Sequence, residues 1–319
     1  MDKRNLGQYY TTHNPFDHPA FHEWSKRVSL FEKTILEPFA GSNNLIDMLK
    51  EKKKDTKTVS YDIEPGRDDV CFRDTLKDFP KGFEVVVSNP PYLAKNSAKR
   101  RGLKFPDTVH DDLYKFSLET ILKNVPNVVA IVPDSFMTSG IFLNRCTDLV
   151  SLNVEMFEDT EHPVCLSFFV SEGGNPRMWV GDRLIGRYDD LRSGVSFGSE
   201  RGHISREWRF NDPDGILGLH ALDSTSGRSI RFVRGSEIPH NVVKVSSRSL
   251  TRISCLDLCE DRLEAVVNRS NEILETHRDQ TCDVFLTSFK GLRKDGMYRK
   301  RLDFRTARHI LNQAMFETE

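Results

Sequence analysis

Residues 33–47 read KTILEPFAGSNNLID, a short apolar run that passes through a turn into the start of a helix. Pro38 and Gly41 end the apolar run, and either Ser42 or Asn43 can cap the helix that follows. That helix carries apolar residues on one side before it reaches the solvated run KEKKK. The stretch therefore predicts a buried strand, a tight turn and an amphipathic helix.

The same alternation continues along the first half of the chain. Further strands are predicted at 58–62, 83–87, 128–132, 152–157 and 164–170, and a further helix at 111–123. Strands that alternate with helices at this spacing predict an α/β fold with a doubly wound, mostly parallel sheet. In such a sheet, ligands bind at the carboxyl ends of the strands.

Three unusual clusters fall at those strand ends, namely EPFAG at 37–41, Asp62, and NPPY at 89–92. We therefore expect them to form a single site. Gly41 lets a ligand approach the backbone closely, and the helix that starts there favours negative charge. Asp62 follows Glu37 by 25 residues, which fits a second strand that presents an acid to ribose hydroxyls. A helix cap or a solvated loop acid is the alternative for Asp62.

The NPPY cluster has the most specific chemistry. Two consecutive prolines fix the backbone and remove two donors, which leaves carbonyl oxygens as acceptors. The side-chain oxygen of Asn89 and the carbonyl of Pro90 can both accept from one amino group. The ring of Tyr92 can stack on a planar substrate.

The segment SEGGNP at 171–176 is the best candidate for a linker. It predicts two domains, residues 1–172 and residues 173–319, the second with a mixed pattern of short strands and helices. Residues 1–175 hold 22 Lys and Arg, of which 15 are Lys, whereas residues 176–319 hold 24, of which 20 are Arg. Arginine suits the recognition of phosphates and guanine edges, so the second domain is the better candidate for a nucleic-acid partner.

Composition excludes several other classes of protein. The net charge of the 319 residues is −1, so bulk charge alone indicates no polyanionic partner. The longest apolar runs are far shorter than the roughly 20 residues of a membrane span, and the sequence MDKRNLGQYYTT lacks the apolar core of a signal peptide. Six scattered cysteines predict free thiols in a reducing compartment and no metal site. We therefore expect a cytoplasmic protein with no membrane partner.

Six motifs in order resemble those of one family: QYYT at 8–11, EPFAG at 37–41, YDIEP at 61–65, RDTL at 73–76, NPPY at 89–92 and IVPDSF at 131–136. They resemble the S-adenosylmethionine-dependent N6-adenine DNA methyltransferases of the gamma arrangement. In that arrangement the cofactor motifs precede NPPY, and a target-recognition domain follows. EPFAG departs slightly from the more usual cofactor motif. The resemblance covers about residues 7–170 and implies a Rossmann-like methyltransferase domain followed by a DNA-binding domain.

The resemblance also implies roles for individual residues. Asn89, Pro90, Pro91 and Tyr92 would be catalytic, and Tyr92 would stack on the target base together with a second aromatic, for which Phe157 is the candidate and His162 the reserve. The residues implied for the cofactor, S-adenosylmethionine, are Tyr10, Thr11, Glu37, Phe39, Ala40, Gly41, Asp62, Ile63, Asp74 and Asn89. No metal is needed for this reaction.

The implied activity is that of a site-specific adenine DNA methyltransferase. Its substrate would be duplex DNA, from which the adenine must be flipped out before its amine can be reached. The expected setting is a restriction-modification system and the expected state a monomer. A cognate restriction endonuclease that acts on the same DNA site is the protein partner that this setting implies.

Two basic segments are candidates for contact with DNA. The loop KNSAKRRG at 95–102 follows NPPY directly and contributes Lys99, Arg100 and Arg101. Residues 290–308 are rich in Lys and Arg, and Asp295-Gly296 predicts a hairpin turn there. In this segment Arg293 and Arg299 are the candidates for reading bases, and Lys294 and Lys300 for binding phosphates.

Three alternatives stay open. NPPY also occurs in methyltransferases that act on a protein glutamine or on ribosomal RNA. Only 36 residues precede Glu37 and 227 follow Tyr92, which together with the Arg-rich second domain favours nucleic acid over a protein glutamine. An RNA substrate is harder to exclude, and a catalytically silent binding subunit is the third alternative.

Overall fold

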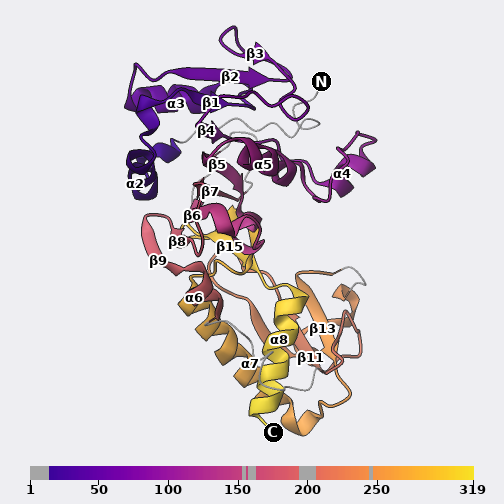
Figure 1. The fold of residues 1–319 in the computed structure, drawn as a ribbon. Helices are drawn as coiled ribbons and strands as arrows, with labels where there is room; N and C mark the ends of the chain where they lie inside the picture. Colours follow the sequence, from indigo (N-terminus) through magenta and orange to yellow (C-terminus); the bar gives the residue numbers. More distant parts are fainter. Residues whose placement is uncertain (1–13, 153–155, 157–162, 194–205, 244–246) are drawn as a thin grey trace. The chain divides into compact units, whose positions relative to one another are not determined.

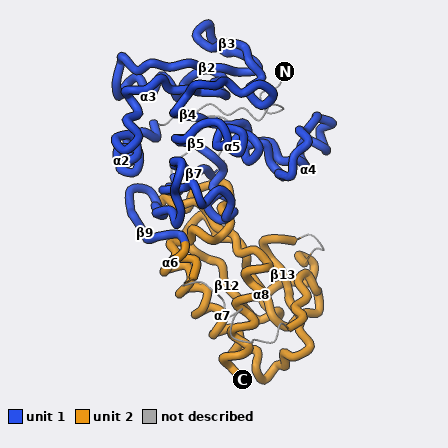
Figure 2. The backbone as a smooth tube through the Cα atoms, in the orientation of Figure 1, with its two compact units in different colours: residues 1–188 blue, residues 189–319 orange. Residues whose placement is uncertain are grey.

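The structure is a computed structural model that describes residues 14–152, 156, 163–193, 206–243 and 247–319. The chain forms two compact units, residues 1–188 and residues 189–319, coloured separately in Figure 2.

Unit 1 contains a nine-stranded sheet in the order β3-β2-β1-β4-β5-β7-β6-β8-β9 (Figure 1). The strands β3, β2, β1, β4 and β5 pair in parallel, whereas β7 runs antiparallel between β5 and β6. The predicted α/β fold with a mostly parallel sheet is confirmed. The strands are β1 (Ile35–Glu37), β2 (Thr58–Asp62), β3 (Cys71–Phe72), β4 (Val85–Ser88), β5 (Asn127–Pro133), β6 (Cys146–Leu152), β7 (Val164–Phe169), β8 (Arg177–Val180) and β9 (Arg183–Arg187).

Two crossovers define where the sheet can hold a ligand. Helix α3 (Asn44–Lys52) connects β1 to β2, and α5 (Leu113–Asn124) connects β4 to β5. Because β2 and β5 lie on opposite sides of the β1–β4 pair, right-handed crossovers put α3 and α5 on opposite faces of the sheet. The order in which strands are added to the sheet thus reverses between β1 and β4, and doubly wound sheets bind their ligands at such a point. The strands beside this point are buried on both faces, as their continuous apolar runs require.

The other helices of unit 1 are α2 (Pro19–Arg27) and α4 (Lys95–Arg100). The segment 95–102, expected as a loop, therefore begins with a short helix. Single turns of 3₁₀ helix occur at η1 (Pro15–Asp17), η2 (Leu30–Glu32), η3 (Asp134–Thr138) and η4 (Leu143–Arg145).

The domain boundary lies later than predicted. SEGGNP connects β7 to β8 within one sheet and is not a linker, because β8 pairs with β6 and β9 pairs with β8. The first unit consequently extends to Tyr188. The edge strand β9 is largely exposed and carries two arginines, like the Arg-rich second unit, which is why the change in pattern near residue 172 does not mark the boundary.

The strand predicted at 152–157 is also displaced, because β6 ends at Leu152. The sequence prediction missed most of β6 because Asp148 interrupts the apolar pattern of this strand. In the structure this carboxylate is buried, and its Oδ1 accepts from Nε of Arg177 at 2.7 Å and from Nε1 of Trp179 at 2.9 Å. A buried acid with two such donors can occupy the interior of a strand.

Unit 2 is a mixed α+β unit, as the sequence predicted. Its antiparallel sheet has the order β10-β13-β11-β12, and β14 and β15 form a separate hairpin. One core combines Leu217 and Phe232 of the sheet with Val266 and Leu311 of the helices. The elements are β10 (Arg209–Phe210), β11 (Leu217–His220), β12 (Arg231–Arg234), η5 (Gly235–Glu237), η6 (His240–Val242), β13 (Leu250–Ser254), α7 (Glu260–Thr281), β14 (Thr287–Leu292), β15 (Tyr298–Arg301) and α8 (Phe304–Glu317), with α6 (Tyr188–Ser193) at the boundary.

The hairpin predicted at Asp295-Gly296 is confirmed. Gly296 has a φ of 77° and donates its N–H to the carbonyl of Arg293 at 2.9 Å, while Arg293 donates its own N–H to Met297 at 2.8 Å. The positive φ is the reason that glycine occupies the last turn position. Among the residues that the structure describes, no helix is both long and apolar enough to span a bilayer.

Candidate functional site

The carboxyl ends of β1, β2 and β4 bring EPFAG, Asp62 and the start of NPPY together. Asp62 at the end of β2 accepts from the Gly41 N–H at 2.8 Å, and Ser88 at the end of β4 donates its hydroxyl to Glu37 at 2.8 Å. These two hydrogen bonds connect three neighbouring strands. The expectation that the clusters meet at one edge of the sheet is therefore met by the geometry.

Glu37 is the last residue of β1 and is only 1% exposed. One of its oxygens, Oε1, accepts from the Phe39 N–H at 2.9 Å as well as from Ser88. Burial nevertheless raises the pKa of this carboxyl to about 8, since these hydrogen bonds offset only part of the cost of a buried charge. The side chain is thus largely neutral at pH 7 and would be ionised more readily beside a cation.

The EPFAG turn is held by the loop that follows β2. Gly41 has a φ of 51°, and its carbonyl accepts from the Gly66 N–H at 3.1 Å. A Cβ atom on Gly66 would lie only 2.9 Å from that carbonyl oxygen, so only glycine fits there. The two loops therefore approach each other backbone to backbone.

Asn43 occupies the N-cap position of α3, one of the two residues that the sequence suggested for it. Its φ is 61° and its side chain makes no capping hydrogen bond. The side-chain oxygen instead accepts from Ser60 at 2.9 Å, and the amide donates to Asp69 at 3.1 Å. Asn43 thus ties the EPFAG turn to β2 and to the loop after it.

Asp62 is a buried acid at a strand end, and neither a helix cap nor a solvated loop residue. Its second oxygen accepts from the Glu64 N–H at 2.8 Å, and burial raises its pKa despite the two backbone donors. The next residue, Ile63, has an apolar side chain that is 48% exposed. A buried carboxylate thus lies beside an exposed aliphatic side chain.

The NPPY segment follows β4 directly. The hydroxyl of Tyr92 lies 2.7 Å from Oδ1 of Asn89 and 2.9 Å from the carbonyl oxygen of Ile131. The Tyr92 ring is 7% exposed and meets Tyr114 edge to face, with the ring centroids 6.2 Å apart. Leu93 then donates its N–H to Asp112, the N-cap of α5, at 3.1 Å. The segment is therefore fixed at both ends.

Asp74 and Thr75 lie in the RDTL motif. The carboxylate of Asp74 pairs with Nζ of Lys77 at 2.7 Å. Thr75 is buried and donates its hydroxyl to the carbonyl of Pro38 at 2.9 Å, which links this motif to the EPFAG turn. Sequence reasoning missed Ser88, Gly66 and Thr75 as positioning residues, although each lies within or directly beside a motif that it did identify.

Four expected site residues, Tyr10, Thr11, Phe157 and His162, lie outside the described residues. Lys99, Arg100 and Arg101 are exposed at the end of α4, which stands apart from the sheet in Figure 1. Within the described ranges there is no cluster of three or more His, Cys, Asp or Glu residues that could hold a metal ion.

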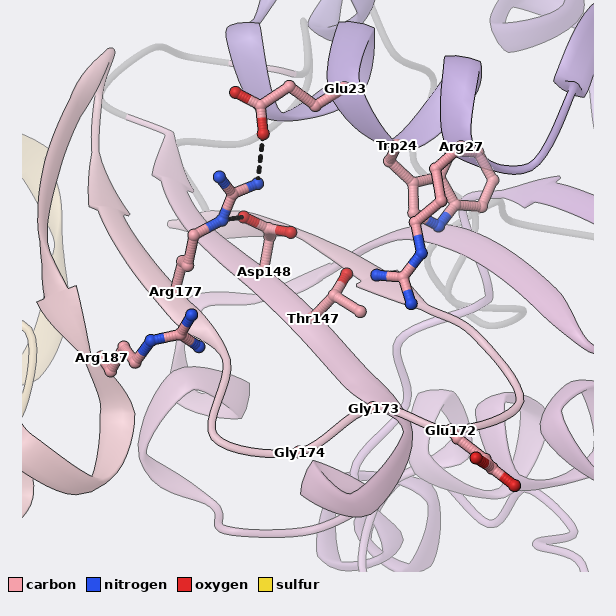
Figure 3. Close-up of a pocket in the computed structure, with 10 residues that line it drawn as sticks. All are labelled: Glu23, Trp24, Arg27, Thr147, Asp148, Glu172, Gly173, Gly174, Arg177 and Arg187. Carbon is pink, nitrogen blue, oxygen red and sulfur yellow. Dashed lines mark hydrogen bonds and ion pairs between the residues drawn. The ribbon is translucent and has the colours of Figure 1, made fainter.

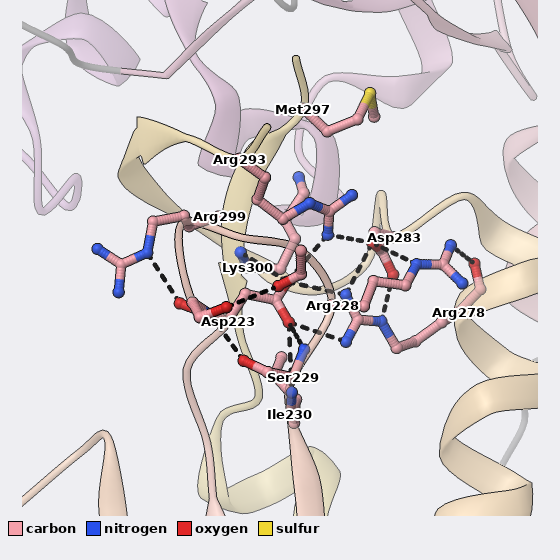
Figure 4. A network of polar contacts seen from close by, with 12 residues as sticks. Asp223, Arg228, Ser229, Ile230, Arg278, Asp283, Arg293, Met297, Arg299 and Lys300 are labelled. Atoms are coloured by element: carbon pink, nitrogen blue, oxygen red, sulfur yellow. Dashed lines mark hydrogen bonds and ion pairs between the residues drawn. The ribbon is translucent and has the colours of Figure 1, made fainter. Parts of the chain in front are cut away.

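The candidates for DNA contact in the second basic segment require a correction. Arg293 is 5% exposed, and its guanidinium pairs with Asp223 at 3.0 Å and Asp283 at 3.3 Å (Figure 4). It also pairs with Asp295 at 2.9 Å. Arg278 also donates hydrogen bonds to Asp223 and Asp283, the two buried acids of this group. A guanidinium held by three carboxylates cannot also read a base edge, so Arg293 is a structural residue.

Lys300 and Arg299 are also engaged in the fold. Lys300 is 4% exposed and donates Nζ to Ser288 at 2.6 Å, so it is not available to phosphates. Arg299 donates Nε to the carbonyl of Asp223 at 2.8 Å and lies over the ring of Phe289. Of the four candidates, Lys294 at the hairpin turn is the one whose side chain is exposed.

A cavity of about 500 Å³ lies beside the first residues of β6 and β8 in unit 1 (Figure 3). These strand starts lie at the end of the sheet opposite to the carboxyl ends that carry EPFAG and NPPY. Arg177 enters the cavity but pairs with Glu23 at 2.7 Å and with Asp148 at 2.7 Å. Its charge is thus satisfied within the protein. The cavity is distant along the strands from NPPY and does not belong to the strand-end site.

The sequence of unit 1 matches a known family. Residues 18–156 match the family described as Eco57I restriction-modification methylase. A search among curated proteins gives no significant match. In the solved structures, the type I restriction-modification methyltransferase subunit of Streptococcus thermophilus is 15% identical with a TM-score of 0.41, over 55% of this chain and 47% of that one. This chain thus spans about half the length of that subunit.

Two further structures have comparable scores. The M protein of the type I restriction enzyme EcoKI is 14% identical with a TM-score of 0.37, over 80% of this chain and 68% of that one. The type IIG restriction endonuclease BpuSI is 16% identical with a TM-score of 0.39, over 55% of this chain and 27% of that one. The resemblance that the motifs carry is confirmed by the family match: residues 18–156 match the Eco57I restriction-modification methylases.

Proposed function

We propose that this chain transfers a methyl group from S-adenosylmethionine to N6 of an adenine flipped out of duplex DNA, as the modification enzyme of a restriction-modification system. The observation that carries the proposal is the position of Asn89, whose side-chain oxygen is oriented by Tyr92 directly beyond β4 and the Ser88–Glu37 hydrogen bond. The family match over residues 18–156 supports it.

The strand-end residues fit the proposed cofactor. The Asp62 carboxylate is suited to ribose hydroxyls, and the exposed side chain of Ile63 is suited to packing on an adenine ring. Glu37 is a buried carboxyl that a nearby cationic group would stabilise in its ionised form, as the amino group of a methionine moiety would. When bound, S-adenosylmethionine would supply an electrophilic sulfonium methyl to the amine nitrogen in one in-line displacement, in which the S–CH3 bond breaks, the sulfur leaves as a neutral thioether and the methylated amine loses one proton to solvent.

Asn89 and Pro90 would prepare the target amine. The lone pair of an exocyclic amine is delocalised into its ring, which makes the amine a poor nucleophile. Acceptors on both of its N–H groups, the Asn89 oxygen and the Pro90 carbonyl, would favour a pyramidal nitrogen whose lone pair points at the methyl group. A carboxamide oxygen can accept two hydrogen bonds, so the bond from Tyr92 is compatible with a second one from the amine. Catalysis would come from positioning and electrostatics.

The two units would have different roles in the reaction. Unit 1 would bind the cofactor and carry out the transfer, with Lys99, Arg100 and Arg101 on α4 contacting the substrate strand. Unit 2 would recognise the DNA site. Flipping costs a few kcal/mol, which aromatic stacking by Tyr92 and Phe157 would offset in part. The burial of the Tyr92 ring means that its stacking requires the base to enter beside Tyr114 or the ring to become more exposed.

A transfer assay tests the proposal. The chain is incubated with radiolabelled S-adenosylmethionine and, in separate reactions, with unmethylated duplex DNA, RNA or protein, and the product is identified by mass spectrometry. We expect N6-methyladenine in DNA, and we expect Asn89→Ala to abolish transfer while lowering cofactor affinity much less than it lowers the rate, because the Asn89 side chain is proposed to bind the target amine. Asn124→Ala, at the exposed end of α5, is the matched control. Labelled RNA or a labelled protein glutamine in place of DNA would favour the alternatives, and binding without transfer would favour a silent subunit.

A further inference from the structure

A second cavity, of about 670 Å³, lies wholly within unit 2, beside β10, the end of β15 and the start of α8. Four arginines line it, Arg209, Arg248, Arg301 and Arg308, against a single acid, Asp303. They come from four separate parts of the unit that the fold brings to one concave surface. Arg301 and Arg308 belong to the basic segment 290–308, whereas Arg209 and Arg248 lie outside both segments that the sequence suggested for contact with DNA.

One acid can offset at most one of the four arginine charges. Asp303 is the N-cap of α8, and its Oδ1 accepts from the N–H groups of Arg305 at 2.9 Å and Thr306 at 3.0 Å. Within the described residues, Arg248, Arg301 and Arg308 form no ion pair with a carboxylate, and Arg209 has one long contact of 3.5 Å with exposed Glu207. Exposed pairs of this kind contribute little and exchange readily. The surface therefore carries an excess of positive charge.

Arg301 is the most constrained of the four. Its side chain is partly buried, and both burial and the neighbouring charge of Arg248 lower its pKa, opposed only by Asp303. Like charges held together in a partly desolvated cavity are unfavourable unless an anion lies between them. The arrangement is thus suited to an anionic ligand with oxygen atoms, which guanidinium groups bind in a bidentate manner.

The aromatic residues indicate which part of a nucleic acid fits. Phe210 stacks on Phe304 with ring centroids 4.3 Å apart, and Arg308 lies over the Phe210 ring at 4.9 Å. The Phe210 ring thus already has an aromatic and a cationic partner within the protein. The two stacked rings form an apolar wall that strengthens the field of the arginines. A concave surface also accepts the convex phosphate ridge of a duplex, whereas base edges lie inside a groove.

We infer that this arginine pocket of unit 2 binds phosphodiester groups of the duplex DNA backbone. The inference rests on the proposed function, because it takes DNA as the substrate. Phosphate contacts fix orientation and register without reading sequence. The pocket would therefore hold the duplex while other residues select the site.

Binding of a fluorescein-labelled duplex to the full chain, measured by anisotropy over a range of salt concentrations without cofactor, tests the inference. We expect Arg248→Ala, Arg301→Ala and Arg308→Ala each to weaken binding to every duplex sequence and to reduce the slope of log K against log salt by about one. Arg231→Ala, an exposed arginine on β12 at the far edge of the same sheet, is the control that should leave the slope unchanged. Thermal melting identifies any variant that misfolds, and Arg248 is exposed enough for its variant to fold.

Two outcomes would overturn the inference. One is an unchanged affinity and salt slope in a folded Arg248→Ala, Arg308→Ala double variant. The other is tighter binding of duplex RNA than of duplex DNA of the same sequence with the same dependence on Arg248, which would assign the pocket to RNA. Failure of the proposed function looks different: the chain would bind DNA through this pocket and still transfer no methyl group to it.

Discussion

The hydroxyl group of Tyr92 lies 2.7 Å from the side-chain oxygen of Asn89, three residues earlier in the chain. Rotation of the carboxamide by 180° exchanges an acceptor for a donor at the same place, and the tyrosine hydroxyl favours the orientation in which the oxygen accepts. The tyrosine hydroxyl is also 2.9 Å from the carbonyl of Ile131 on β5. The orientation of Asn89 is thus coupled to the strand next to its own.

Tyr92→Phe is expected to slow methyl transfer while leaving cofactor affinity unchanged. The variant keeps the ring but loses the hydroxyl that orients Asn89. A hydrogen bond of this kind is worth about 1 kcal/mol, which corresponds to a decrease in kcat of about fivefold. Single-turnover transfer beside cofactor titration measures both quantities. Tyr61→Phe on β2 is the control, and equal rates for Tyr92→Phe and wild type would show that Asn89 needs no such support.

Asp62→Ala is expected to do the reverse of Asn89→Ala. Hydrogen bonds from two ribose hydroxyls to a charged acceptor are worth about 1.5–3 kcal/mol each, so affinity for S-adenosylmethionine should fall at least tenfold. The structure adds a second effect, because the variant leaves the N–H groups of Gly41 and Glu64 without their acceptor. The melting temperature should therefore also fall. Calorimetric titration and thermal melting test these effects, with exposed Asp68→Ala as the control; an unchanged dissociation constant would remove Asp62 from the cofactor site.

The site could be predicted in outline because its signals are local. EPFAG and NPPY each follow a buried apolar run, and their glycine and proline residues end the strand that the run forms. The carboxyl ends of such strands meet at one edge of a parallel sheet. The supporting contacts could not be predicted, because they join distant positions. Ser88 and Glu37 are 51 residues apart, and the acid that removes Arg293 from the surface, Asp223, is 70 residues away. A charge pattern shows which side chains are basic but not which of them are already paired.

Glu37→Gln is expected to change how stability depends on pH. The carboxyl has a folded pKa of about 8 against an ordinary value of 4.5, so between these pH values the native state holds a proton that the unfolded state has released. The free energy of unfolding contributed by this group therefore falls as pH rises through that window. Urea denaturation of both proteins at about pH 5 and about pH 9 tests this. The wild type should lose stability relative to Glu37→Gln at the higher pH, and parallel curves would mean that Glu37 is ionised in the folded protein.

Duplex DNA that carries 2-aminopurine at the methylated position should become more fluorescent on binding, because the probe leaves the base stack. Tyr92→Ala should weaken this response more than Tyr61→Ala, since Tyr92 lies in the strand-end site. The same increase at a position that is not methylated would argue against flipping of the target base.

Arg293 and Lys294 are adjacent in sequence, but substitution of Arg293 should lower the stability of the protein and substitution of Lys294 should not. Arg293→Met removes a guanidinium that Asp223, Asp283 and Asp295 share, and leaves two of these acids buried with Arg278 as their main remaining partner. Removing one member of a buried ion pair costs about 3–5 kcal/mol. The substitution should therefore lower the urea concentration at the midpoint of unfolding. Any loss of DNA binding should be equal for all DNA sequences and should match the fraction of protein in which unit 2 is unfolded. Lys294→Met, at the exposed turn, should leave stability within about 0.5 kcal/mol of the wild type. A stable Arg293→Met protein that lost affinity for one DNA sequence alone would restore this arginine as a reader of bases.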